Sequence, residues 1–325
     1  MNQPRTVFYH HPCLDGTTAA WAAYQKWGDN AEYIGVDHAA YEQTQVKILD
    51  HVTPETIAVF VDFAPRTQVL ENIIDKVKGV EIFDHHVSAQ KDLQPFLDHP
   101  KCHIYFDMNR SGAGIAFDEF SNGAARPLFI EMVERIDLYK PERFDTPDQF
   151  YLVSSYLSSL DMGKPLAQMM PLINELVGVQ DISVFEHRGR DPRNAYLEQV
   201  EQVLKDVDFV NLTILETASG CFEVPFARAS INDMGHEFSP KLLARCPHEH
   251  KMGMVWHFHD HKTVKLSLRS DGHIDVSMIA EEMGAEHGIN GGGHKGAAAV
   301  RFTVEQFREF APKINYNFNA IPPEA

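Results

Sequence analysis

The sequence predicts an α/β protein with two lobes. A parallel sheet with a helical extension forms the first lobe, and a smaller α/β lobe follows. Three observations lead to this fold class. Strand-like and helix-like segments alternate over the first 120 residues, which is typical of a parallel sheet covered by helices. Residues 56–63 are nearly all apolar, as in a strand buried on both faces. Short strands return after about residue 210, beyond a helical stretch.

The first third supplies the expected elements of the parallel sheet. The strand segments are short β-rich or apolar runs, and they cover residues 6–11, 31–36, 56–63, 79–86 and 102–108. Between them lie segments with helical composition, at residues 17–27, 66–77 and 111–120. A turn at Asp15-Gly16 separates the first strand from the first helix.

From about Pro127 to Val207, apolar residues recur at three- and four-residue spacing. This pattern predicts helices over 128–139, 148–160, 164–177 and 194–207, the last connecting the two lobes. The second lobe should contain strands over 221–229, 251–259, 263–270 and 297–304, with helices over 239–246, 276–284 and 304–314. We therefore expect domains at 1–209 and 210–325.

Composition limits the classes of function. The net charge of −17 argues against binding along long nucleic acid, which needs a basic face. A pocket with divalent cations can still be locally positive on an acidic body. The four cysteines are far apart, and no apolar run approaches the ~20 residues that span a bilayer. The N-terminus lacks the regions of a signal peptide. We expect a reducing, cytoplasmic compartment and no membrane partner.

Potential metal ligands cluster where three expected strands end. The side chains are imidazoles, carboxylates and one thiol: His10, His11, Cys13 and Asp15 after the first strand, Asp62 after the third, and Asp84, His85 and His86 after the fourth. Any one of them is explained as a strand-end polar group or a helix cap. As a set, they lie where an open parallel sheet forms its crevice. These ligands suit Mn²⁺ and other divalent metals, and a bridging carboxylate can hold two ions for phosphoryl chemistry.

The motifs resemble the DHH phosphoesterase superfamily. The segment FDHHVSAQ follows an apolar strand and is preceded by FVDF. Near the other end, NGGGHKG resembles the GGGH signature of the DHH-associated C-terminal domain. The resemblance implies a Rossmann-like DHH catalytic domain and a substrate-binding C-terminal domain. The resemblance covers nearly the whole chain. The superfamily includes nanoRNases, cyclic-dinucleotide phosphodiesterases, single-strand exonucleases and family II pyrophosphatases.

The resemblance also implies roles for individual residues. Asp15 matches a ligand of one metal, Asp62 the carboxylate that bridges two metals, and His85 the metal-binding histidine of the DHH triplet. His86 matches the histidine that faces the scissile phosphate, and Asp84 supports these histidines from behind. Asp137 is our choice for the aspartate of the family's fourth motif.

The first motif departs from most of the superfamily, because Cys13 stands where an aspartate is usual. Either His10 or His11 is the imidazole ligand, since adjacent strand residues point to opposite faces. If Cys13 coordinates as a thiolate, it shifts the preference toward Zn²⁺ or Fe²⁺. If Cys13 does not coordinate, the first metal site is weak. Whether one or two ions bind therefore stays open.

A second group of residues is predicted to bind substrate. Gly291, Gly292 and Gly293 allow backbone N–H groups to approach an anion, and His294 and Lys295 add donors. The resemblance assigns this segment, expected as a loop, to substrate binding, with Arg269 as a phosphate partner. Arg110, before a small-residue helix, is a weaker phosphate candidate. The histidines at 248–250 and 257–261 look like metal clusters but are discounted, and the second group is interpreted as a hairpin.

These observations predict a metal-dependent phosphodiesterase that hydrolyses very short oligonucleotides or linear dinucleotides to mononucleotides. Two alternatives are a phosphatase for 3′-phosphoadenosine 5′-phosphate or a polyphosphatase, and a nucleotide-binding sensor without hydrolysis. The expected partner is a small phosphate ester; a homodimer is left open.

Overall fold

A computed structural model describes residues 4–37, 41–213, 221–229, 237–289 and 291–318. The chain divides into two compact units, Met1–Arg193 and Asn194–Ala325, which are described separately. Their boundary lies inside one helix, α9 (Ile182–Lys205), whereas the sequence places a domain boundary at 209/210. The α/β fold class is confirmed, with a parallel sheet in the first unit and a second sheet in the other.

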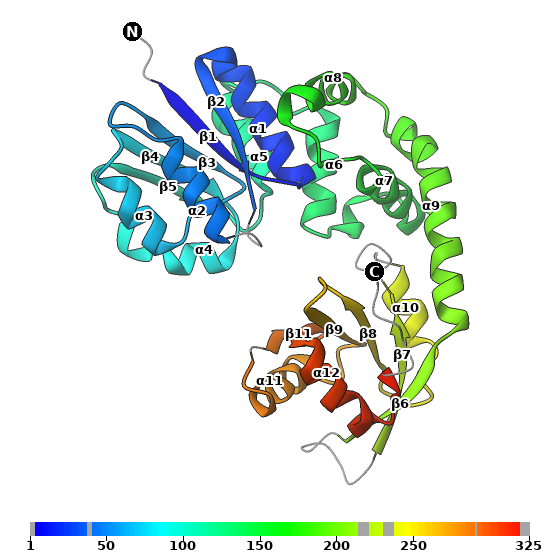
Figure 1. Ribbon diagram of the computed structural model, residues 1–325. Helices are drawn as coiled ribbons and strands as arrows, with labels where there is room; N and C mark the ends of the chain where they lie inside the picture. Colours follow the sequence, from blue (N-terminus) through cyan, green and yellow to red (C-terminus); the bar gives the residue numbers. More distant parts are fainter. Residues whose placement is uncertain (1–3, 38–40, 214–220, 230–236, 290, 319–325) are drawn as a thin grey trace. The chain divides into compact units, whose positions relative to one another are not determined.

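The first unit is built on a five-stranded parallel sheet of order β2-β1-β3-β4-β5 (Figure 1). The strands are β1 (Arg5–His10), β2 (Ala31–Val36), β3 (Ile57–Val61), β4 (Gly79–Asp84) and β5 (Cys102–Phe106). All four neighbouring pairs are parallel. After β2 the chain returns past β1 to form β3, so the order reverses between β1 and β3. This reversal is the point at which open α/β sheets bind ligands.

Alternation along the strands builds a core on each face of this sheet. Val7, Tyr9 and Val61 pack with α1 (Leu14–Trp27) and α5 (Gly112–Phe120). Phe8 and Phe60, whose rings stack at 5.0 Å, pack on the other face with α2 (Tyr41–Asp50) and α3 (Thr67–Ile74). The short α4 (Val87–Asp92) follows β4. The sequence patterns predict neither α2 nor α4.

The helical extension has four helices: α6 (Leu128–Asp137), α7 (Pro147–Ser158), α8 (Leu166–Val177) and α9. Helix α9 begins twelve residues earlier than expected and runs through Pro192. The packing of α9 at Gly189 accounts for part of the difference between the observed and the expected start of the helix. A Cβ at this position would lie 1.9 Å from the backbone oxygen of Leu152, so glycine lets α9 pack directly against α7.

The second unit contains a six-stranded mixed sheet of order β10-β11-β9-β8-β7-β6. The strands are β6 (Asp208–Thr213), β7 (Cys221–Arg228), β8 (Met252–Phe258), β9 (Thr263–Ser270), β10 (Gly291–His294) and β11 (Ala297–Thr303). Only the β7–β8 pair is parallel. The hairpin expected around residues 257–261 is present, since β8 and β9 pair antiparallel across it.

Helices cover both faces of the second sheet. The main core lies under α11 (Val276–Glu286) and α12 (Val304–Phe310), around Trp256 and Phe302. On the opposite face, α10 (Phe238–Leu243) and the end of α9 pack over β7 and β8. Within the described residues of both units, none of the helices is long and apolar enough to cross a bilayer.

Candidate metal centre

Three adjacent strands bring the predicted ligands of the first unit together. Asp15 lies in the first turn of α1 after β1, Asp62 follows β3, and His85 follows β4. Because β1, β3 and β4 are neighbours in a parallel sheet, their carboxyl ends meet at one edge. The side chains converge beside the reversal of strand order.

Asp15 is fixed by the start of α5. Its two carboxylate oxygens accept the backbone N–H groups of Gly112 at 2.6 Å and Ala113 at 2.9 Å. Ser111 caps the same helix, with its hydroxyl accepting the N–H of Gly114 at 3.2 Å. A helix N-terminus presents unpaired N–H groups and favours a carboxylate. The small-residue segment at 111–114 therefore positions a predicted metal ligand 97 residues away.

Asp62 occupies an unusual backbone position. Its φ of +52° lies in the left-handed region, where aspartate and asparagine are tolerated better than most other residues. A Cβ at Gly112 would lie 2.3 Å from the Cβ of Asp62, so only glycine fits opposite it. Such conformations persist where the surrounding structure enforces them and are common at functional sites.

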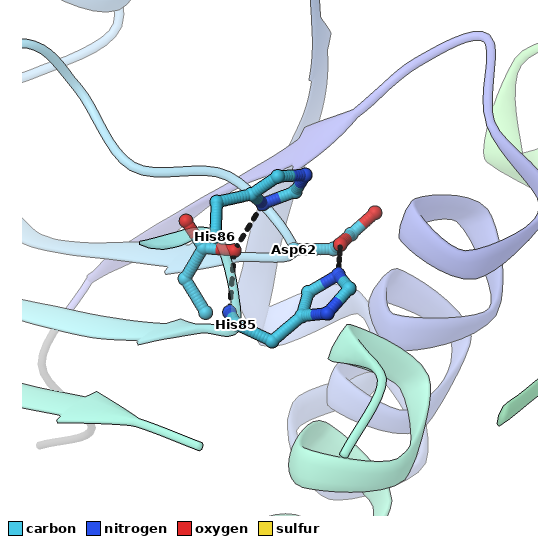
Figure 2. Close-up of side chains that lie close together, drawn as sticks. Asp62, His85 and His86 are labelled. Carbon is cyan, nitrogen blue, oxygen red and sulfur yellow. Dashed lines mark hydrogen bonds and ion pairs between the residues drawn. The ribbon is translucent and has the colours of Figure 1, made fainter. Parts of the chain in front are cut away.

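An imidazole lies near each carboxylate oxygen of Asp62, and Figure 2 shows the contact to His85. Its Oδ1 lies 3.2 Å from Nε2 of His85, and its Oδ2 lies 3.5 Å from Nδ1 of His10. Asp62 is 1% exposed, yet neither oxygen has a hydrogen bond of good geometry within the described structure. A buried carboxylate in this state needs a further partner, and a cation satisfies it.

His85 links Asp62 to two more carboxylates. Its Nε2 lies 3.8 Å from Oδ2 of Asp15 and 3.6 Å from Oδ2 of Asp137, which ends helix α6. One ligand atom from each of Asp15, His85 and Asp137 falls within 4.8 Å of the others. The structure thus places Asp137, chosen from the sequence, in the cluster.

His86 is held by the first residue of the DHH triplet. Its Nδ1 lies 2.7 Å from Oδ1 of Asp84, and the same oxygen accepts the backbone N–H of His85 at 2.7 Å (Figure 2). Asp84 is fully buried, whereas the side chain of His86 is 37% exposed. The Asp84 hydrogen bond raises the pKa of His86 to about 9, so the imidazole carries a proton at neutral pH.

The charges of the cluster favour a bound cation. Burial raises the pKa of Asp15 well above its usual value, and the Asp62 and Asp137 carboxylates raise it further. Burial also raises the pKa of Asp137. For Asp62, burial acts in the same direction, but His10 and His85 outweigh it and lower the pKa. Carboxylates at this spacing repel one another without positive charge between them. The donor set of carboxylates and imidazoles fits divalent metals such as Mn²⁺.

The two histidines at the end of β1 have different surroundings. His10 faces Asp62, and together with Cys13 it completes a group of possible ligands within 4.8 Å. His11 instead stacks edge-on against Tyr9, with ring centroids 5.8 Å apart, and is not in that group. Burial raises the pKa of the Cys13 thiol, as do the Asp62 and Asp15 carboxylates. The metal-free cluster therefore holds Cys13 as a thiol.

Arg110 is occupied by carboxylates. Its Nε lies 2.8 Å from Glu134, and its terminal nitrogen lies 3.0 Å from Asp118. Arg126 contacts both acids at 2.9 Å. Glu134 also accepts the N–H of Ser111 at 3.2 Å. The structure thus places Arg110 in a four-residue ion network beside α5. A contact between Arg110 and the substrate phosphate stays a prediction.

The Glu134 network should support the metal centre through the start of α5. Glu134→Ala is expected to lower the free energy of unfolding by about 1–3 kcal/mol, because two part-buried guanidinium groups and the N–H of Ser111 lose Glu134, and the guanidinium groups keep only the more exposed Asp118. Chemical denaturation of the metal-free protein measures this. Glu131→Ala on the same helix removes only an exposed pair with Arg135, and should cost less than about 1 kcal/mol. Equal losses in the two variants would contradict the assignment.

In the second unit, Arg269 and His294 lie on the same face of the sheet. Arg269 pairs with Ala297 across β9 and β11, and Ala297 pairs with His294 across β11 and β10. Directly paired residues point to the same face. The structure therefore brings these two predicted substrate-binding residues together, with only the methyl group of Ala297 between them.

Further polar side chains, which are not among the predicted site residues, share this face. They are Lys265, Ser267 and Arg301, on β9 and β11. The hydroxyl of Ser267 is buried without a hydrogen-bond partner in the described structure. Burial lowers the pKa of Lys265, and Arg301 and Arg269 lower it further. The sequence contains a pattern that identifies the residues on β9, because the polar residues of the segment TVKLSLRS recur with period two.

The triple glycine is an edge strand, so the predicted loop is wrong. Gly291–His294 pairs antiparallel with β11, while Lys295 lies in the following turn. Gly292 and Gly293 have φ values of +156° and +150°. A Cβ at Gly291 would lie 1.8 Å from the backbone oxygen of Ala280. The glycines let β10 pack against α11, so their presence has a structural cause as well as the predicted binding role.

This close approach makes Gly291 sensitive to substitution. Gly291→Ala should lower the free energy of unfolding by roughly 1–3 kcal/mol, because the backbone of β10 or α11 must shift. Gly296→Ala is the matched control, since the nearest atom to its Cβ would be 3.8 Å away. Thermal denaturation of both variants measures the difference. A Gly291→Ala protein as stable as the control would show that β10 does not need this contact.

One of the discounted histidines lies in an exposed cluster. His250 stacks on His273 at 4.7 Å between ring centroids, and Nδ1 of His273 lies 3.2 Å from Asp271. The two oxygens of Asp271 already accept the backbone N–H groups of Lys251 and His273. These hydrogen bonds lower the pKa of Asp271 to about 2. The carboxylate thus stabilises the turn after β9.

Comparison with known proteins identifies the C-terminal part. Residues 247–320 match the DHHA1 domain, the domain associated with DHH proteins. The match supports membership of the DHH superfamily. Together with the carboxylate and imidazole cluster, it supports a metal-dependent phosphoesterase of the DHH type. No curated protein matches the chain.

Two solved structures are similar over nearly the whole chain. A crystal structure of CDC45 from Entamoeba histolytica is 8% identical and covers 96% of this chain and 94% of its own, with a TM-score of 0.52. This likeness shows the fold alone. An uncharacterized protein from Helicobacter pylori G27 is 14% identical and covers 98% of this chain and 100% of its own, with a TM-score of 0.33.

Proposed function

We propose that the protein is a Mn²⁺-dependent phosphodiesterase that hydrolyses linear dinucleotides and very short oligonucleotides to mononucleotides. The observation that carries the proposal is the convergence of Asp15, Asp62, His85 and Asp137, with the Asp84–His86 pair beside them. When bound to such a cluster, divalent ions neutralise phosphate charge and activate water for attack at phosphorus.

The protein's own residues have separate tasks in this reaction. Asp15, Asp62, His85, Asp137 and His10 would hold the metal. The start of α5 keeps Asp15 oriented through two backbone hydrogen bonds. His86, protonated through its contact with Asp84, is suited to give a proton to the leaving oxygen as the phosphorus–oxygen bond breaks. The attacking water supplies the new oxygen on phosphorus, so a dinucleotide yields two mononucleotides.

The sheet face of the second unit supports a small anionic ligand. Arg269, Lys265 and Arg301 place three cations on neighbouring strands, and the small side chains of Ala297 and Ala299 leave room between them. A phosphate group suits this arrangement, because guanidinium groups recognise phosphate oxygens in pairs. With a net charge of −17, a local basic face of this extent favours a short ligand over long nucleic acid.

The test is a product assay on the full chain. Purified protein with Mn²⁺ is incubated separately with 5′-phosphorylated diadenylate, 3′-phosphoadenosine 5′-phosphate, polyphosphate and a long RNA. Anion-exchange chromatography should show two AMP molecules per diadenylate, with the long RNA intact. A double Asp84→Ala/His85→Ala variant is the inactive control. Faster phosphate release from the bisphosphate or polyphosphate would reassign the substrate. Binding without turnover of any substrate would support a sensor.

The face of the second unit is tested in the same assay. Arg269→Ala should raise the KM for diadenylate by about tenfold or more, the typical effect of losing one charged hydrogen bond. Arg308→Ala removes an exposed arginine from α12 and should leave KM unchanged. An unchanged KM in Arg269→Ala would exclude Arg269 as a phosphate partner.

A further inference from the structure

The first unit contains a cavity that the metal chemistry does not use. Its volume is about 420 Å³, within the usual range for small-molecule sites. It lies along the edge strand β2 and is bounded by residues from β1, α1 and α2 and by the start of α8. Its lining is largely aromatic and aliphatic, and includes three tyrosines.

The tyrosine rings are held in place before any ligand binds. The hydroxyl of Tyr24 donates to Asp29 at 3.0 Å, and that of Tyr33 donates to the backbone oxygen of Gly28 at 3.1 Å. Tyr9 hydrogen-bonds to the backbone of Leu166 at the start of α8. The hydroxyls are therefore engaged with the protein. The rings of Tyr24 and Tyr33, which are half-buried, offer pre-positioned aromatic surface, and Tyr9 belongs to the core beneath. Because these side chains are already ordered, the binding of a planar ligand costs little conformational entropy.

The ring of His11 is also part of the cavity lining. Its Nδ1 is buried and has no hydrogen-bond partner in the described structure. The ring is fixed against Tyr9 on one side and above Gly35, where a Cβ would lie 2.8 Å from the Cβ of His11. Because this nitrogen has almost no accessible surface, the His11 ring contributes a wall of the cavity and not a polar contact. The preceding residue, His10, faces the metal cluster.

We propose that this cavity binds the heterocyclic base of a nucleotide. Aromatic walls, with the polar side chains of Asp29 and Lys47 in the lining, suit a flat, mostly apolar ring with hydrogen-bonding groups at its edge. The choice of a nucleobase over other planar rings rests on the proposed function. Stacking on fixed aromatic side chains is a sequence-tolerant way to hold a base. Lys47, at the same cavity, adds a cation for an attached phosphate.

A nucleoside is the sharpest probe of this site, because it lacks the phosphate that the metal cluster and the basic face would bind. Saturation-transfer NMR with the full chain in EDTA should show adenosine binding, with the base protons receiving most of the saturation. Ribose, which has no base, should give no signal. Ala167→Phe fills the cavity from an exposed position on α8 and should weaken adenosine binding at least tenfold. The neighbouring Gln168→Phe, also exposed and outside the lining, should bind like the wild type.

Each outcome has a defined meaning. Equal adenosine binding in wild type and Ala167→Phe, no binding in the millimolar range, or binding of ribose as strong as that of adenosine would overturn the inference. The dinucleotide assay on the same samples separates it from the proposed function. Hydrolysis without adenosine binding removes the base pocket and keeps the enzyme. Adenosine binding without hydrolysis keeps the pocket and removes the enzyme.

Discussion

Replacing Asp62 with asparagine should lower Mn²⁺-dependent hydrolysis of diadenylate by roughly 10³-fold, about 4 kcal/mol of lost transition-state stabilisation. Asp62 is the carboxylate nearest to both His10 and His85, so the amide removes the central charge of the cluster. Asparagine tolerates the left-handed φ of this position, so the backbone should stay in place. Initial rates with and without Mn²⁺ measure the effect.

The stability of this variant distinguishes a metal ligand from a structural residue. Without metal, Asp62→Asn should be less stable than the wild type, because His10 and His85 favour the ionised carboxylate in the folded protein. Mn²⁺ should raise the melting temperature of the wild type and leave that of Asp62→Asn unchanged. Asp107→Asn is the control, since Asp107 follows the neighbouring strand β5 outside the cluster. Equal Mn²⁺ stabilisation of Asp62→Asn and wild type would exclude Asp62 as a ligand.

Asp84→Asn should move the alkaline limit of activity to lower pH. In the wild type, the Asp84 hydrogen bond raises the pKa of His86 to about 9, so a proton donor is available up to that pH. Without the carboxylate, the pKa returns toward the ordinary value of about 6.5. At about pH 8.5 the protonated fraction then falls by roughly 80-fold, and kcat/KM should fall with it if His86 is the acid. A pH profile of both proteins tests this.

The same pair predicts a pH effect on stability. Because the pKa of His86 is raised on folding, its stabilising contribution is full below about pH 6.5 and is lost as the pH rises through about 9. Melting temperatures in EDTA should therefore converge for wild type and Asp84→Asn above this range. Asp107→Asn should follow the wild type throughout. In the activity profile described above, an unchanged alkaline limit of kcat/KM in Asp84→Asn would show that His86 is not the proton donor.

Much of the first unit could be predicted because local patterns and fold geometry agree there. Apolar strand segments separated by helices led to a parallel sheet, and the strand ends led to Asp15, Asp62 and His85. Alternation predicted that only one of His10 and His11 would face the metal cluster, but not which one. That choice depends on which face α1 and α5 cover, which the sequence of β1 alone does not contain.

The remaining differences come from contacts between distant residues. Arg110 is a predicted phosphate partner because it precedes a small-residue helix, and its contacts with Glu134 and Asp118 could not be predicted from that local pattern. The triple glycine was expected as a loop, yet Ala280 approaches it so closely that a strand without side chains is required. Strand β6 and helices α2 and α4 have weak periodicity, and tertiary packing decides their structure.

The tight contact between Gly112 and Asp62 offers a way to recognise related chains. A sequence that retains Asp-His-His but carries a bulky residue two positions after the arginine of the Arg-Ser-Gly-Ala-Gly run has no space for an aspartate at the end of β3. Glycine at 114 is constrained in the same way by Glu134. Searches that join the tripeptide to this small-residue run would separate chains able to build the full cluster from those that merely share three letters.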